Sequence, residues 1–187
     1  LHSTSRRQRQ MCIETDANYN NGITGKDTLF IQKASVTVTA VNHGINGKDS
    51  LTIKNADITV TSGGDALRST NDSDPTLGYL VITGSALKLT AGEDGIQTET
   101  TLTISGGTAT VTTAGGAGQS ISDDTSAKGL KAGTQVAVTG GTLQLNCCDD
   151  AIHSNGDVTI SGGSFTIATG DDGIAAYAAG PTPPYTT

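Results

Sequence analysis

The apolar residues of this chain return at a fixed interval. A small residue followed by an aliphatic one recurs with its small member at positions 22, 44, 66, 95, 129, 151 and 173. The interval is 22 residues, apart from two intervals that carry insertions of 7 and 12 residues. Self-similarity at such a period is typical of proteins built from stacked structural repeats.

Each repeat contains three short stretches in which apolar and polar residues alternate. In the second repeat Leu51 and Ile53 form one apolar pair, and Ile58 and Val60 form the next, seven residues further on. Period-two alternation in segments rich in Val, Ile and Thr predicts strands rather than helices. Strands this short cannot build a core alone, so each is expected to pair with its equivalent in the next repeat.

The pattern therefore predicts an all-β fold, a single-stranded right-handed parallel β-helix. Each 22-residue coil would hold three short strands, with about six to seven coils in total. The right-handed sense is expected because crossovers between parallel strands nearly always have that hand. We predict three parts: a polar N-terminal tail or cap remnant at 1–19, the β-helix domain at 20–179, and a Pro/Thr-rich tail or linker at 180–187.

Composition narrows the range of partners. With 18 acidic and 11 basic residues the net charge is −7, which argues against a nucleic-acid partner. No apolar run approaches the length needed to span a membrane. No segment that would cap the first coil is recognisable, and uncovered strand edges at the two ends would favour self-association. Cys147 falls in a column of small residues and is expected to pack inward.

Acidic residues gather at the corner that precedes each small residue. Aligning the repeats brings seven carboxylates into two groups, separated by Lys128: Asp65, Glu93 and Asp94 in one, and Asp149, Asp150, Asp171 and Asp172 in the other. Carboxylates on adjacent coils would repel one another by roughly 1 kcal/mol per pair even in water. Calcium takes six to eight oxygen ligands, so each group is a candidate calcium site. The alternative is that each Asp simply caps its own turn.

A second row lies two residues beyond each small residue. It contains Arg68, Gln97, Lys131 and His153 on four consecutive coils. If the preceding aliphatic residue points inward, this row faces outward. Polar donors beside bound cations would form a groove for an acidic sugar chain. The alternative is an ordinary solvated face.

These motifs resemble a known family. Glu93-Asp94-Gly95-Ile96, Asp149-Asp150-Ala151-Ile152 and Asp171-Asp172-Gly173-Ile174, together with the Thr-Ile-Ser-Gly-Gly turns at 103–107 and 159–163, are similar to the bacterial carbohydrate-binding parallel β-helix family typified by a clostridial cellulose- and acid-sugar-binding protein. The resemblance covers roughly residues 20–176. It implies a polysaccharide-lyase-like helix, calcium at the corner, and extracellular or cell-surface binding of polysaccharide without established catalysis. Asn21, His43 and Lys128 depart from the acidic pattern.

Three functions are compatible with the sequence. The leading one is a noncatalytic calcium-binding module for cellulose or an acidic, uronate-type polysaccharide. The second is a structural surface or fibre subunit that assembles end to end through the β-helix ends. The third is a calcium-dependent polysaccharide lyase, in which Arg68 or Lys131 would remove a proton from the sugar.

Overall fold

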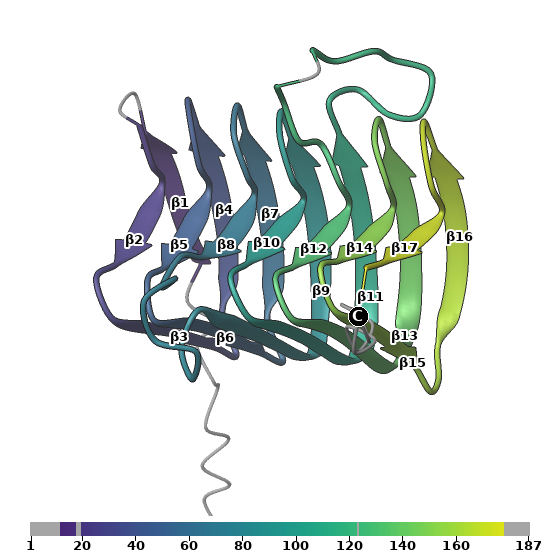
Figure 1. Ribbon diagram of the computed structural model, residues 1–187. Helices are drawn as coiled ribbons and strands as arrows, with labels where there is room; N and C mark the ends of the chain where they lie inside the picture. The colour runs from purple at the N-terminus through teal and green to yellow at the C-terminus, as the bar shows by residue number, and fades with distance from the viewer. Residues whose placement is uncertain (1–11, 18–19, 123, 178–187) are drawn as a thin grey trace, which may run out of the picture.

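The computed structural model describes residues 12–17, 20–122 and 124–177, and these residues contain only strands and connecting segments (Figure 1). The prediction of an all-β, parallel architecture is confirmed. The strands are β1 (Cys12–Ala17), β2 (Ile23–Gly25), β3 (Thr28–Gln32), β4 (Ser35–Ala40), β5 (Ile45–Gly47), β6 (Ser50–Lys54), β7 (Asp57–Ser62), β8 (Leu67–Ser69), β9 (Tyr79–Ala91), β10 (Ile96–Thr98), β11 (Thr101–Thr113), β12 (Leu130–Ala132), β13 (Gln135–Cys147), β14 (Ile152–Ser154), β15 (Asp157–Ile160), β16 (Ser164–Thr169) and β17 (Ile174–Ala176). No helix able to span a membrane is found in this described part.

Strand pairing follows the sequence repeat. A 7-stranded sheet, which we call the corner sheet, has the order β17-β14-β12-β10-β8-β5-β2, and all its pairs are parallel. Its register joins equivalent residues, for example Ile23 with Ile45 and Ile45 with Leu67. A 10-stranded parallel sheet contains the remaining strands, so neighbouring strands always come from neighbouring repeats.

In three repeats the two predicted strands of the larger sheet are continuous. β9, β11 and β13 each have 13 residues and contribute to both halves of that sheet. A residue with positive φ lies where the two predicted strands meet, for example Gly84 (56°) and Gly106 (78°). The equivalent residues in the first two repeats are Lys33 (51°) and Asn55 (49°). Glycine lacks a Cβ and therefore adopts this backbone conformation without steric strain.

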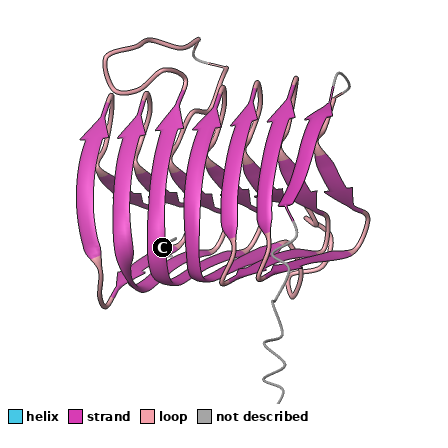
Figure 2. Ribbon diagram, turned by 180° about the vertical axis from the view of Figure 1, so that it is seen from behind, coloured by secondary structure: helices cyan, strands magenta, loops and turns pink. Residues whose placement is uncertain are grey.

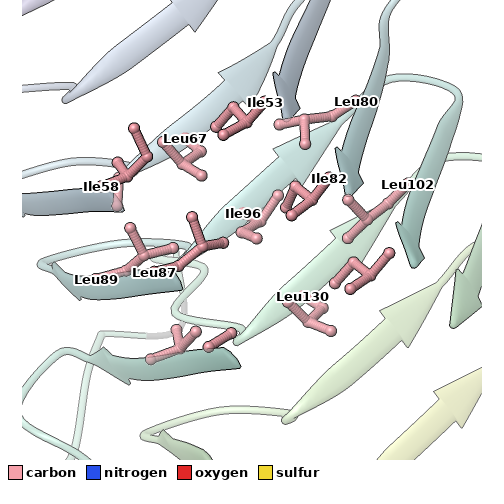
Figure 3. Packing of buried hydrophobic residues seen from close by; sticks show 14 of the residues in the cluster. Ile53, Ile58, Leu67, Leu80, Ile82, Leu87, Leu89, Ile96, Leu102 and Leu130 are labelled. Atoms are coloured by element: carbon pink, nitrogen blue, oxygen red, sulfur yellow. The ribbon is translucent and has the colours of Figure 1, made fainter. Parts of the chain in front are cut away.

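The core is a set of aliphatic columns between the two sheets. In each strand of the corner sheet except the outermost two, the first residue is fully buried, as for Leu67, Ile96 and Leu130. Figure 3 shows these side chains beside Ile82 and Leu102 of the 10-stranded sheet, within one hydrophobic cluster. Cys147 is fully buried as predicted, because it replaces a small residue in an inward column.

The predicted tails at 1–19 and 180–187 lie outside the described residues, except for residues 12–17. Those six residues form β1, which pairs in register with β4. The repeat pattern did not predict this strand, because the recognisable period begins at Gly22.

Candidate functional site

The residues that precede the small residue of each repeat form what we call the corner row. Its three buried carboxylates are Asp65, Asp94 and Asp150, which are 6%, 2% and 4% exposed. In each, Oδ1 accepts the backbone N–H of the next member of the row: Asp65 from Asp94 (3.1 Å), Asp94 from Lys128 (2.8 Å), and Asp150 from Asp172 (3.1 Å). One carboxylate oxygen therefore caps the following repeat, which explains part of the acidic pattern without any metal.

The same ladder explains two departures from the acidic pattern. Asn21 Oδ1 accepts the N–H of His43 at 3.4 Å, and His43 Nδ1 lies 3.0 Å from the N–H of Asp65. Asparagine and neutral histidine both supply an acceptor, so they can replace aspartate in this structural role. The ammonium group of Lys128 cannot accept a hydrogen bond, so the N–H of Asp150, the next member of the row, donates instead to Asp149 Oδ1 at 2.8 Å.

The second oxygen of each buried carboxylate meets a cationic or imidazole side chain. Asp94 Oδ2 accepts from Lys131 Nζ at 3.0 Å, and Asp65 Oδ2 lies 3.6 Å from Arg68 Nη1. Asp150 Oδ2 lies 3.3 Å from Lys128 Nζ and 2.7 Å from His153 Nδ1. Three members of the predicted sugar-binding row, Arg68, Lys131 and His153, therefore face the corner acids directly.

A polar cavity of about 340 Å³ opens over the first group of acids. It receives side chains from both predicted rows and from the loop between β11 and β12. The lining residues are His43, Asp65, Arg68, Thr70, Glu93, Asp94, Gln97, Glu99, Asp124, Thr125, Ser126 and Lys131. The loop is anchored to the corner row because Ser126 donates to Asp94 Oδ1 at 2.7 Å and Lys131 Nζ lies 3.0 Å from Ser126 Oγ. Figure 1 shows this loop, the longest connection among the described strands, arching away from the sheets.

Asp65 has an unfavourable environment for a carboxylate. Its burial, together with the charges of Asp94 and Glu93, raises its pKa from 3.8 to about 7, although Arg68 acts in the opposite direction. A cation placed beside Asp65 would favour the ionised form. Oxygen atoms of Asp65 and Glu93 lie within 4.8 Å of one another, which permits both to contact a single ion.

His43 is neutral at physiological pH. Burial, and then the charge of Arg68, lower its pKa from 6.5 to about 4, so its contact with Asp65 at 3.3 Å is not an ion pair. A neutral imidazole has one lone pair, yet His43 faces two donors, the N–H of Asp65 at Nδ1 and Arg68 Nη1 at Nε2 (2.8 Å). Arg68 Nε is also buried without a partner. The hydrogen-bonding capacity of Arg68 is thus only partly used inside the protein.

The second group of acids contains its own cation. Lys128 Nζ lies 2.5 Å from Asp149 Oδ2 as well as 3.3 Å from Asp150 Oδ2. Burial alone would raise the pKa of Asp149, but its hydrogen bonds with Lys128 and with the backbone of Asp150 hold it below its usual value. Lys128 therefore joins the acids on this side rather than interrupting the row. Asp171 also reaches Asp149 and Asp150 to within 4.8 Å.

The structure divides the predicted site residues in a way that the repeat alone did not indicate. Arg68, Gln97 and Lys131 line the polar cavity, whereas His153 lies with the second group, where it also approaches the ring of Tyr177 at 5.3 Å. The carboxylate of Asp94 already accepts hydrogen bonds from Lys131, Ser126 and the backbone N–H of Lys128, whereas Asp172 is exposed. His43, Glu99, Asp124 and Ser126 were not predicted. The position of the insertion beside the corner row was the signal that could have found Asp124 and Ser126.

Calcium suits the chemistry of these donors. Asp149, Asp150 and Asp171 offer oxygen ligands only, which is the preference of this ion. An ion there would compete with the Lys128 ammonium for Asp149 and Asp150. In the first group Asp65 and Glu93 are suitable ligands, while the nitrogen of His43 is not a typical calcium ligand.

The fold and this site together define a class: an all-β protein of in-register parallel repeats with a charged cavity along one row of corners. Residues 12–173 match the family described as carbohydrate-binding domain-containing protein, and because the match covers most of the chain, the protein belongs to that family. Its membership indicates a carbohydrate-binding function. Neither a protein of curated function nor a solved structure matches the chain.

Proposed function

We propose that this protein is a noncatalytic, extracellular module that binds an acidic polysaccharide or cellulose in the polar cavity with the help of calcium. The observation that carries this proposal is the meeting of Arg68, Gln97 and Lys131 with Asp65 and Glu93 in one cavity. The first three offer donors for sugar oxygens, and the last two offer ligands for a cation. The cavity volume is within the range of roughly 300–1,000 Å³ that small-molecule sites occupy.

Bound calcium would offset the excess negative charge of the cavity. Its lining contains the acids Asp65, Glu93, Asp94, Glu99 and Asp124 against the bases Arg68 and Lys131, so an anionic sugar faces net repulsion. An ion held by Asp65 and Glu93 would offset this charge and attract a uronate carboxylate. A second calcium is proposed at Asp149, Asp150 and Asp171, where it would displace the Lys128 ammonium.

We further propose that the repeats are the coils of a right-handed parallel β-helix. Three observations support this description: the three strand segments per repeat, the pairing of every strand with its equivalent in the next repeat, and the uniformly parallel register. Parallel connections within a sheet are right-handed in nearly all proteins. An experimentally determined structure showing left-handed coils would contradict the proposed hand.

The binding proposal is tested by isothermal titration with oligogalacturonate and with cello-oligosaccharide, each in calcium and in chelator. We expect calcium-dependent binding that weakens about tenfold or more in Arg68→Gln and Lys131→Gln, because each loses a charge-assisted hydrogen bond worth about 1.5–3 kcal/mol. His153→Gln is the matched control from the same row, since His153 lies outside the cavity. Equal affinity in all four proteins, with or without calcium, would refute the proposed site.

The same samples also test the alternative function, a polysaccharide lyase. Elimination from a uronate polymer forms a conjugated double bond that absorbs ultraviolet light, and a noncatalytic module leaves this absorbance unchanged. Lys131 Nζ already contacts Asp94 and Ser126, so it would have to leave both to act as a base. Calcium-dependent growth of the absorbance that is lost in Lys131→Gln would favour the enzyme.

The second candidate function is end-to-end assembly. Ile174 in β17 is 49% exposed, although the equivalent Ile152 in β14 is fully buried, so the last described repeat presents apolar surface. Analytical ultracentrifugation over a wide concentration range tests this proposal. Concentration-dependent assembly that is abolished by Ile174→Lys would favour a structural subunit.

A further inference from the structure

One face of the 10-stranded sheet has a composition unlike the rest of the chain. We call it the threonine face, and it consists of the outward residues of β4, β7, β16 and the second halves of β9, β11 and β13. Figure 2 shows these strands side by side. The register aligns the outward residues in three columns: Ser35, Asp57, Ala86, Thr108, Thr142, Ser164; Thr37, Thr59, Lys88, Thr110, Gln144, Thr166; and Thr39, Thr61, Thr90, Thr112, Asn146, Ala168.

The outward direction of these residues follows from the alternation of the strands. Their neighbours in sequence, such as Val60, Leu89 and Val111, are almost completely buried in the core. The eighteen face residues themselves are all exposed or half-buried. The face is therefore a surface feature of six consecutive repeats.

The chemistry of this face is nearly free of charge. Ten of its eighteen residues are threonine, and within these six strands the only charged residues are Asp57 and Lys88, of opposite sign. The edge strand β1 beside β4 continues the second and third columns with Glu14 and Asp16, so charge lies at one margin of the face. The whole chain carries a net charge of −7, so most of the charge is elsewhere. Each threonine presents a hydroxyl, which donates and accepts hydrogen bonds, beside a methyl group.

The face is also periodic in two directions. Neighbouring strands of a sheet lie about 4.7–4.9 Å apart, and outward residues along one strand lie roughly 6.6 Å apart. Two shallow cavities follow it, one of about 170 Å³ at Thr59 and Lys88 and one of about 310 Å³ at Thr110, Gln144 and Thr166. A regular array of this kind suits a partner whose surface is itself periodic.

We propose that the threonine face is a second carbohydrate-binding surface, and that it holds the ordered surface of a crystalline neutral polysaccharide. This inference rests on the carbohydrate-binding part of the proposed function but requires neither calcium nor the polar cavity. A neutral partner is favoured because the face has no row of charges to pair with an ionic polymer. Threonine hydroxyls can exchange hydrogen bonds with sugar hydroxyls while the methyl groups contact the C–H faces of the rings.

The stiffness of threonine contributes to this role. A β-branched side chain has few rotamers, so it loses little conformational entropy when a ligand covers it. The side chains are also held on paired strands rather than on loops, which keeps the array in place before the partner arrives. The cavity and the threonine face would then recognise different forms of polysaccharide, one as a single chain and the other as a packed solid.

The test is depletion of the protein from solution by microcrystalline cellulose in the presence of chelator. The variant Thr61→Glu/Thr112→Glu places two charges on the face, at positions that flank Thr90 in the register. The matched control is Thr52→Glu/Thr103→Glu, which changes the same residue type in the same two repeats and flanks Val81 in the other half of the sheet. Thermal melting establishes that all three proteins are folded.

We expect the wild type and the control to bind cellulose in chelator, and the face variant to show a partition coefficient lower by about tenfold or more. No binding by the wild type, or equal binding by the face variant, would overturn the inference. Sedimentation that shows a wild-type dimer and a monomeric face variant, with cellulose binding unaffected, would instead assign the face to a second copy of the chain.

Calcium-dependent oligogalacturonate binding is measured on the same variants. Loss of this binding in every protein would refute the proposed cavity site without contradicting the inference about the threonine face.

Discussion

The charge of Asp65 is expected to oppose folding at neutral pH when no cation is bound. Its pKa is raised from 3.8 to about 7 by burial and by Asp94 and Glu93. Asp65→Asn removes the charge and keeps an oxygen that can accept the N–H of Asp94, a contact of 3.1 Å in the native protein. The variant should therefore be more stable than the wild type in chelator at neutral and alkaline pH.

The magnitude follows from linkage between protonation and folding. A pKa raised from 3.8 to about 7 corresponds to roughly 4 kcal/mol at 1.36 kcal/mol per pKa unit. Below about pH 4 both folded and unfolded states are protonated, and the two proteins should be alike. Between about pH 4 and pH 7 only the folded state keeps the proton, so this group lowers the free energy of unfolding as the pH rises. The difference between the two proteins reaches its full value above about pH 7.

The assay is urea denaturation of both proteins at intervals from about pH 4 to pH 8, in chelator and in calcium. Asp27→Asn is the control, because Asp27 is an exposed aspartate. Calcium should stabilise the wild type more than Asp65→Asn, and an ion at 100 times its dissociation constant would add about 2.7 kcal/mol. Parallel stability curves for wild type and Asp65→Asn across this pH range would refute the reasoning.

Three further outcomes are expected. Lys128→Met should lower the free energy of unfolding by about 3 kcal/mol at neutral pH, because Asp149 and Asp150 lose their cation. In thermal melts calcium should restore part of this loss, and the control Lys54→Met should have little effect. Gly95→Ala should destabilise by about 1–3 kcal/mol in urea, since its Cβ would lie 2.3 Å from a Val side chain and 2.6 Å from a backbone oxygen, whereas Gly173→Ala meets nothing within 4 Å and should be neutral. The Cys147 thiol should resist iodoacetamide in the native protein and react in urea, because burial raises its pKa to about 11; rapid native labelling would contradict its burial.

Much of the architecture was readable from the chain alone. The 22-residue interval, the alternation within each stretch and the inward position of Cys147 depend on which residues are apolar, and that information is local to each repeat. Because each strand pairs with its equivalent one repeat away, counting along the sequence also placed Asp65, Asp94 and Asp150 in one row. The acids and the donors of the second row were therefore predicted as neighbours before any coordinates were considered.

The partners of those acids were decided by the tertiary structure. The period places backbones, but the direction of a side chain depends on burial and on the insertions, which do not repeat. The loop before Lys128 brings Ser126 to Asp94, and Lys131 reaches the same carboxylate, so this acid is satisfied within the protein while Glu93 lines the cavity. Sequence position gave the row of charges, and three-dimensional packing determined which of them remain to face a ligand.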